Sequence, residues 1–215
     1  MGGREESSLI SDKASRTADP EDSALQALFR VIASRDRPMT SRLLAESPLI
    51  AQLAIKVGAT REGASPYYFQ KISHYAYAGD TPLHIAAAAY QREIAEELVS
   101  KGANVRARNR RGAEPLHYAT DGIPGSDAWD PAAQYAIVQF LIRAGANPNS
   151  VDKSGVAPLH RAVRTRCTGA VRALLMNGAD ALGRNKSGST PLHLAVQNTG
   201  RGGAGTARAQ GAGTR

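Results

Sequence analysis

Thr81-Pro82-Leu83-His84 is the stretch that decides the fold, because the same four residues return at Thr190-Pro191-Leu192-His193. Two near-copies lie between them, Glu114-Pro115-Leu116-His117 and Ala157-Pro158-Leu159-His160. The four copies begin 33, 43 and 33 residues apart. Self-similarity at a period of this size predicts an array of stacked units, each of which buries its apolar face against its neighbours.

The rest of each copy keeps the same phase as its opening. A pair of large apolar residues and then a Gly-Ala pair follow at matched offsets, with ten extra residues in the second copy: Leu98-Val99 and Gly102-Ala103, Leu141-Ile142 and Gly145-Ala146, Leu174-Leu175 and Gly178-Ala179. With these motifs the chain resembles the ankyrin-repeat family from about residue 76 to residue 198. The resemblance implies an all-α repeat solenoid of stacked helix–turn–helix repeats joined by β-hairpin-like loops.

Each recurring residue has a physical role in such a repeat. The proline suits the first turn of a helix, where a missing N–H costs nothing. Thr81 and Thr190 can cap that helix, whereas Ala157 cannot, which we expect to cost about 1 kcal/mol. The leucine of each copy is expected to face the core: Leu83, Leu116, Leu159 and Leu192. The glycines 102, 145 and 178 are expected to end the second helix in a left-handed conformation.

The sequence predicts three regions. Residues 1–22 carry three basic and six acidic side chains without an apolar core, so we expect a disordered acidic tail rather than a secretory signal. Residues 23–198 are predicted to form the ankyrin-repeat domain, with a divergent N-terminal helical pair at 25–50, an inserted segment at 52–78, clear repeats from 79, 112 and 155, and a half repeat from 188. Residues 199–215 are predicted to be a Gly-rich disordered tail, and the abrupt loss of pattern there favours a truncated array, with Leu174 and Leu175 partly exposed.

Aromatic residues set two further segments apart. The inserted segment holds Tyr67-Tyr68-Phe69 and Tyr75, and we expect these to pack it as a short helix against the solenoid. The ten extra residues near 120–129 hold the only tryptophan, Trp129. Long loops on rigid scaffolds often carry function, so Trp129 is a candidate partner-binding residue. The alternative is that Trp129 folds back over its repeat to cover apolar surface.

Basic residues gather on the predicted hairpins and first helices. The net charge is +8, and since residues 1–22 hold −3, the remainder holds +11. The candidates are Arg106, Arg108, Arg110 and Arg111 on one hairpin, Arg161, Arg164 and Arg166 on the first helix of the third clear repeat, and Arg184 and Lys186 on the next hairpin. In ankyrin-like solenoids, hairpin tips and first helices form one concave surface. We therefore expect a protein partner with an acidic surface, although such charges can also serve solubility alone.

A second hypothesis is that the same arginines bind nucleic acid or another polyanion. That function needs regularly spaced phosphate contacts and usually stacking aromatics. Aromatic residues make up 5% of the chain, and few fall near the arginine hairpin in sequence. We therefore expect nucleic acid to be the less favoured partner.

No motif indicates catalysis, a cofactor, a metal or a small-molecule substrate. The four repeated histidines occupy one repeat position, and repeats about 8–10 Å apart cannot share an ion with bonds near 2 Å. We expect them to bond to the preceding threonine or nearby backbone instead. Cys167 and His160 are too far apart on one predicted helix to act as nucleophile and base, and Gly200–Gly205 lacks the strand and helix of a dinucleotide site.

Composition suggests where the protein works. The sequence has one cysteine and so cannot form an intramolecular disulfide, which suits a reducing compartment. It contains no apolar stretch of the roughly eighteen residues that a membrane span needs. We expect a non-catalytic, cytoplasmic protein that does not associate with a membrane.

Overall fold

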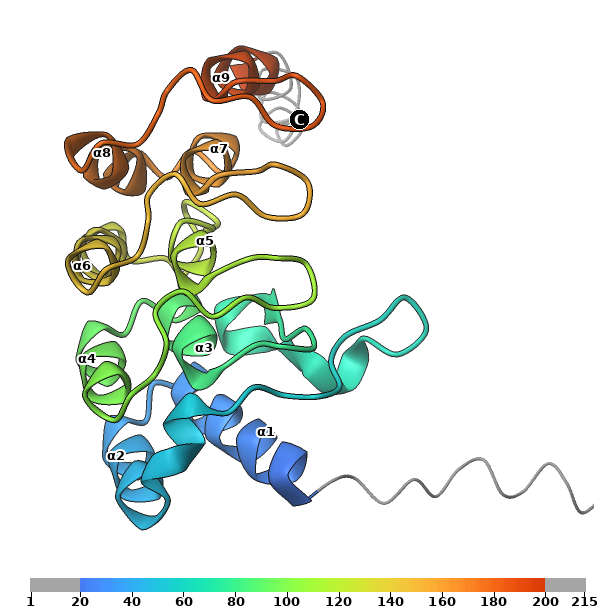
Figure 1. Cartoon of the computed structure of the whole chain (residues 1–215), viewed down its shortest axis with the longest axis vertical. Coiled ribbons are helices and arrows are strands. Elements are labelled where there is room, and N and C mark those ends of the chain that lie inside the picture. The colour runs from blue at the N-terminus through green and yellow to red at the C-terminus, as the bar shows by residue number, and fades with distance from the viewer. Residues whose placement is uncertain (1–19, 200–215) are drawn as a thin grey trace, which may run out of the picture.

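The computed structural model describes residues 20–199 and shows a stack of helical pairs (Figure 1). The inner-row helices α3, α5, α7 and α9 span Pro82–Ala88, Pro115–Ala119, Pro158–Arg164 and Pro191–Thr199. The outer-row helices α4, α6 and α8 span Arg92–Ser100, Pro131–Arg143 and Thr168–Met176. Contacts run along each row, such as α3 with α5 and α6 with α8, so the expected repeat solenoid is confirmed. The predicted tails lie outside the described residues, apart from their innermost positions.

Buried leucines and small alanines build the core of the stack. Leu83, Leu116 and Leu159 have almost no exposed surface, and the alanine three positions after each leucine is fully buried. Because alanine is small, successive inner-row helices approach closely. Leu192 was expected to be buried in the same way, but it is 69% exposed, because no outer-row helix follows α9 among the described residues.

The repeated histidines tie each repeat to the next. Nδ1 of His84, His117 and His160 accepts the backbone N–H three residues earlier, at 3.1–3.3 Å. Nε2 of each ring lies 3.1 Å from a backbone carbonyl of the following hairpin, so Nε2 carries the proton and donates it. The expected structural role of these histidines is confirmed. At Ala157 this bond covers the backbone N–H of Ala157 itself and not that of His160, which a threonine cap would accept.

The N-terminal helical pair is α1 (Pro20–Ala33) and α2 (Arg37–Glu46). Helix α1 contacts α3, and α2 contacts α4, so the pair extends both rows of the stack. Helix α1 begins inside the segment predicted to be a tail. The reason is Asp22, whose buried carboxylate accepts the backbone N–H groups of Lys56 and Val57 at 2.9 and 3.1 Å. A long-range contact therefore orders residues whose composition alone indicated disorder.

The inserted segment is not the expected short helix. It contains two short 3₁₀ turns, η3 (Ser65–Tyr67) and η4 (Gln70–Ile72), and a two-stranded antiparallel hairpin, and a third turn, η2 (Pro48–Gln52), connects it to α2. The strands β1 (Tyr68–Phe69) and β2 (His74–Tyr75) pair Tyr68 with Tyr75, whose rings also contact each other. Phe69 is buried against Phe29 of α1. Alternating burial of Tyr68 and Phe69 is the signature of a strand, which explains why the helix prediction fails.

The C-terminal end of the stack exposes apolar side chains. Leu175, Met176 and Val196 are 47%, 64% and 65% exposed. Leu174, which was also expected to show on this face, is fully buried instead, because its side chain points into the core of its own repeat.

Candidate partner-binding face

The hairpins between repeats stack on one another through backbone hydrogen bonds. The N–H of Arg110 donates to the carbonyl of Ala78 at 2.7 Å, that of Lys153 to Arg111 at 2.9 Å, and that of Lys186 to Ser154 at 3.0 Å. All hairpins project from the same side of the stack, beyond the inner row (Figure 1). The ladder brings Arg110, Arg111, Lys153 and Lys186 into one series, which we call the hairpin row.

Local sequence explains the shape of each hairpin. Asn109, Asp152 and Asn185 occupy one repeat position, and the side-chain oxygen of each accepts two backbone N–H groups of its own turn. A glycine follows three residues later with a positive φ, +72° at Gly155. A Cβ atom on Gly155 would lie 2.9 Å from the backbone nitrogen of Lys186, so glycine also permits the close approach of the next hairpin.

The side chains of the hairpin row are exposed and carry no compensating charge. Lys153 and Lys186 make no ion pair with any residue in the described part of the chain. The guanidinium groups of Arg110 and Arg111 lie 5.4 and 4.8 Å from the centre of the Tyr77 ring. Arg110 also donates to the carbonyl of Ala59. These two arginines are therefore held against the inserted segment.

Three other predicted arginines make contacts between or within hairpins. Arg106 donates to the carbonyl of Gly145 at 2.6 Å. Arg108 donates to the buried carboxylate of Glu114 and to the Ser150 hydroxyl, each at 3.0 Å. Arg184 donates to the carbonyl of Gly188 at 2.7 Å. Arg108 thus compensates a buried charge, and its removal would affect stability as well as binding.

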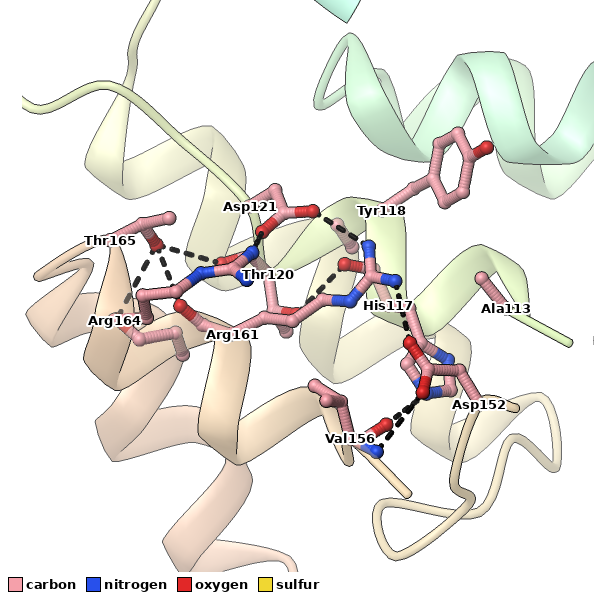
Figure 2. A network of polar contacts seen from close by, with 12 residues as sticks. Ala113, His117, Tyr118, Thr120, Asp121, Asp152, Val156, Arg161, Arg164 and Thr165 are labelled. Carbon is pink, nitrogen blue, oxygen red and sulfur yellow. Dashed lines mark hydrogen bonds and ion pairs between the residues drawn. The ribbon is translucent and has the colours of Figure 1, made fainter. Parts of the chain in front are cut away.

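Arg161 does not belong to the accessible face. Its side chain is 11% exposed and lies between two carboxylates, with Nη1 2.8 Å from Asp121 and Nη2 3.1 Å from Asp152 (Figure 2). Asp121 follows α5 and Asp152 belongs to the next hairpin, so Arg161 joins three segments. Burial lowers the pKa of the guanidinium, but the carboxylates of Asp121 and Asp152 outweigh burial, and the pKa is raised. Arg161 was predicted to contact a partner, but in the structure its side chain is mostly buried and is occupied by these two ion pairs.

Arg164 and Arg166 lie close to this cluster. Arg164 ends α7 and reaches Asp121 at 3.5 Å, with 55% of its side chain exposed (Figure 2). Arg166 was expected on the first helix, but α7 ends before it, and Arg166 takes a left-handed turn conformation with φ +61°. Both are exposed. Arg164 lines a cavity together with Arg111 and Ser154 of the hairpins, whereas Arg166 lies in the turn between α7 and α8.

Trp129 folds back on its own repeat. Its ring is partly buried against the core, and Nε1 donates to Oε1 of Gln134 at 3.0 Å. It also lines a cavity of about 160 Å³ together with Ile72, His74 and Tyr118. The structure therefore gives Trp129 the covering role that sequence analysis left as an alternative.

His74 of the inserted hairpin lies over this part of the molecule. Its ring contacts Tyr118, with ring centres 4.3 Å apart, and its Nε2 is buried without a hydrogen-bond partner. Burial lowers the pKa of His74, against the raising effect of Asp121 and Asp80, so the ring is neutral near pH 7. His74 and Arg161 both line a second cavity of about 280 Å³.

Within residues 20–199 the structure offers no arrangement for a bound metal, since no three His, Cys, Asp or Glu side chains come together in a suitable group. The helices of the same region are all too short or too polar to cross a membrane. Cys167 is buried and free, at the start of α8 and not on the helix of His160.

Comparison with known families agrees with the geometry. The family model described as ankyrin repeats in three copies matches residues 48–126 and 131–204. The chain belongs to the ankyrin-repeat family. Ankyrin repeats generally serve as scaffolds for protein interaction and are typically non-catalytic. No curated protein matches the chain.

Lys153 is the hairpin residue that sequence analysis missed, although the signal was present. It follows Arg110 by 43 residues and precedes Lys186 by 33, which are the spacings of the repeats themselves. One repeat position thus carries a basic residue in three successive ankyrin hairpins. Tyr77 occupies the equivalent position one repeat before Arg110, and its ring packs beneath Arg110 and Arg111.

Proposed function

We propose that this ankyrin-repeat protein is a non-catalytic scaffold that binds an acidic protein surface through its hairpin row. The observation that supports the proposal is the backbone ladder, because it aligns basic side chains from three successive repeats. Two acidic residues of these hairpins are already paired with arginines: Asp152 pairs with Arg161, and Glu114 pairs with Arg108. The row is therefore left with an excess of positive charge, which accelerates association with an acidic partner.

Three of the residues predicted to bind a partner have structural roles instead. Arg161 and Arg108 compensate buried carboxylates, and Trp129 covers its repeat. The remaining candidates are Arg106, Arg110, Arg111, Arg164, Arg166, Arg184 and Lys186, to which Lys153 is added. Lys153 and Lys186 are the best reporters of binding, because their side chains can be changed without removing an ion pair among the described residues. We place this interaction in the cytoplasm, since a chain with one cysteine suits a reducing compartment.

The test compares two variants of equal charge. The double variant Lys153→Ser with Lys186→Ser removes charge from the hairpin row, whereas Arg143→Ser with Arg172→Ser removes the same charge from exposed sites on the outer-row helices α6 and α8. Each variant and the parent chain serve as bait in the same cell extract, and the captured proteins are quantified. We expect the hairpin variant alone to lose an acidic partner. Equal capture by all three baits would refute the proposal.

Nucleic acid is the rival partner, and one experiment separates it. The parent chain is applied to immobilised polyglutamate and to immobilised single-stranded DNA at increasing salt. Binding to nucleic acid falls steeply with salt because condensed counterions are released from phosphates. If the chain stays bound to DNA at a salt concentration that releases it from polyglutamate, nucleic acid is favoured over an acidic protein as the partner.

A further inference from the structure

A cavity of about 350 Å³ opens where the loop at residues 57–64 faces the hairpin that carries Arg110 and Arg111. The loop projects on the same side of the solenoid as the hairpins (Figure 1). Three arginines and two tyrosines line the cavity: Arg61, Arg110, Arg111, Tyr75 and Tyr77. No acidic residue lines it. The inserted segment of this chain builds most of the cavity, and the repeat array contributes Arg110 and Arg111.

Two of the guanidinium groups are positioned before any ligand arrives. Arg110 and Arg111 both lie within 5.4 Å of the centre of the Tyr77 ring. Stacking on an aromatic face occupies the flat side of a guanidinium and leaves its N–H edge available. Arg110 is fixed further by its bond to the carbonyl of Ala59, and its backbone N–H is fixed by Ala78. Little side-chain entropy therefore remains to be lost on binding at these two positions.

The charge and number of donors indicate the ligand. A carboxylate has two oxygens and one negative charge, which match a single guanidinium group. A phosphate ester on a side chain has three terminal oxygens and carries a charge near −1.5 to −2 at pH 7. It can therefore bond to three guanidinium groups at once, each through a charge-assisted hydrogen bond. We propose that this cavity binds a phosphorylated side chain of a partner protein.

The hairpin row extends this site in a defined direction. Arg111 lies in the cavity, and the ladder continues from it to Lys153 and then to Lys186. Successive repeats are about 8–10 Å apart, and an extended peptide advances roughly 3.3 Å per residue. One repeat thus corresponds to about three peptide residues. The partner segment is therefore a phosphorylated residue with acidic residues three and six positions away. This inference rests on the proposed function, of which it specifies the ligand.

The probe is a Gly-Ser peptide with a central phosphoserine and a glutamate at three and at six positions on both sides. The symmetric design covers both chain directions. Two matched peptides carry Ser or Glu at the centre. Binding to the full chain is measured by fluorescence anisotropy at about 0.15 M salt, where surface charge is screened beyond about 8 Å. Inorganic phosphate and a short single-stranded oligonucleotide serve as competitors.

We expect the phosphopeptide to bind about tenfold more tightly than the Glu peptide, because charge-assisted bonds to two further arginines are gained. Arg61→Gln and Arg111→Gln should each abolish most of that difference. Both arginines are exposed, so thermal melting should confirm that the variants remain folded. Lys153→Ser should weaken binding of the phosphopeptide and of the Glu peptide by the same factor. Arg143→Gln, on the outer row, is the control of equal charge and should change neither.

The outcomes separate the two proposals. If the Glu peptide binds as well as the phosphopeptide while Lys153→Ser weakens both, the phosphate inference fails and the proposed function stands. If Lys153→Ser changes neither, the proposed function fails. Displacement by inorganic phosphate at the same concentration as by phosphopeptide would show that the cavity takes free phosphate, which overturns the assignment to a partner side chain. Tighter binding of the oligonucleotide than of the phosphopeptide would overturn both in favour of nucleic acid.

Discussion

Replacing Arg161 with methionine should destabilise the protein by about 3 kcal/mol. Removing one partner of a buried ion pair typically costs about 3–5 kcal/mol, because the other charge remains without compensation. Arg161 is 11% exposed and pairs with Asp121 and Asp152, which are 20% and 10% exposed. The lower end of the range applies for two reasons. Asp121 retains Arg164 at 3.5 Å, and Asp152 retains the backbone N–H groups of Ser154 and Val156.

The assay is urea unfolding, followed by the fluorescence of Trp129, the only tryptophan, and by circular dichroism. Arg164→Ala is the control, and should cost at most about 1 kcal/mol, because an exposed ion pair contributes little. Asp152→Asn in the methionine background should recover part of the loss, since Asn109 and Asn185 support the same turn in the neighbouring hairpins. A cost below about 1 kcal/mol for Arg161→Met, or no recovery with Asp152→Asn, would refute the ion-pair interpretation.

Three further predictions concern the repeats. Burial lowers the pKa of His117 to about 4 from an unfolded value of 6.5, so the folded protein holds this ring neutral. The contribution of His117 to stability is therefore complete above pH 6.5. It falls by about 3 kcal/mol as the pH drops to about 4, since each pKa unit corresponds to roughly 1.4 kcal/mol. Urea denaturation midpoints measured from pH 7 to pH 4 should show this loss of stability, and the loss should be smaller in the His117→Gln variant. Ala157→Thr should raise the urea midpoint by an amount equivalent to about 1 kcal/mol, since the Thr190 hydroxyl already accepts the N–H of His193 at the same repeat position; an unchanged midpoint would contradict the capping role. Leu159→Ala should cost about 2–5 kcal/mol, whereas Leu192→Ala, at a side chain that is 69% exposed, should cost about 0.5 kcal/mol or less in the same titration. Equal costs would contradict the assigned burial.

The parts of the fold that sequence reasoning captured are those specified locally. The proline, leucine and glycine of each repeat act within one helix or turn, so their spacing alone locates the helices of the array. The inserted hairpin escaped prediction because its strands are two residues long and have no counterpart in the other repeats. Short apolar runs of this kind do not distinguish strand from helix.

The sequence predicted most of the basic residues of the candidate site, but not which of them form ion pairs. Position and charge identified Arg110, Arg111 and Lys186, and the same repeat spacing would have identified Lys153. The burial of Arg161 could not be inferred, because Asp121 and Asp152 come from segments 40 and 9 residues away along the chain. Tyr77 was distant from Arg110 in sequence, and only the stacking of hairpins places it beneath the arginines.

In the hairpin ladder, the atoms that hold the hairpins together differ from the side chains that are available to a partner. Backbone atoms make the bonds between successive hairpins, while turn geometry depends on one Asn or Asp and one Gly per repeat. The side chains of Lys153 and Lys186 take part in neither the backbone ladder nor the turn, so a new residue at these positions can alter recognition with little effect on folding. An engineered library confined to positions 153 and 186 could thus acquire new specificities on an unchanged scaffold, and each substitution would change only the contact made by its own repeat.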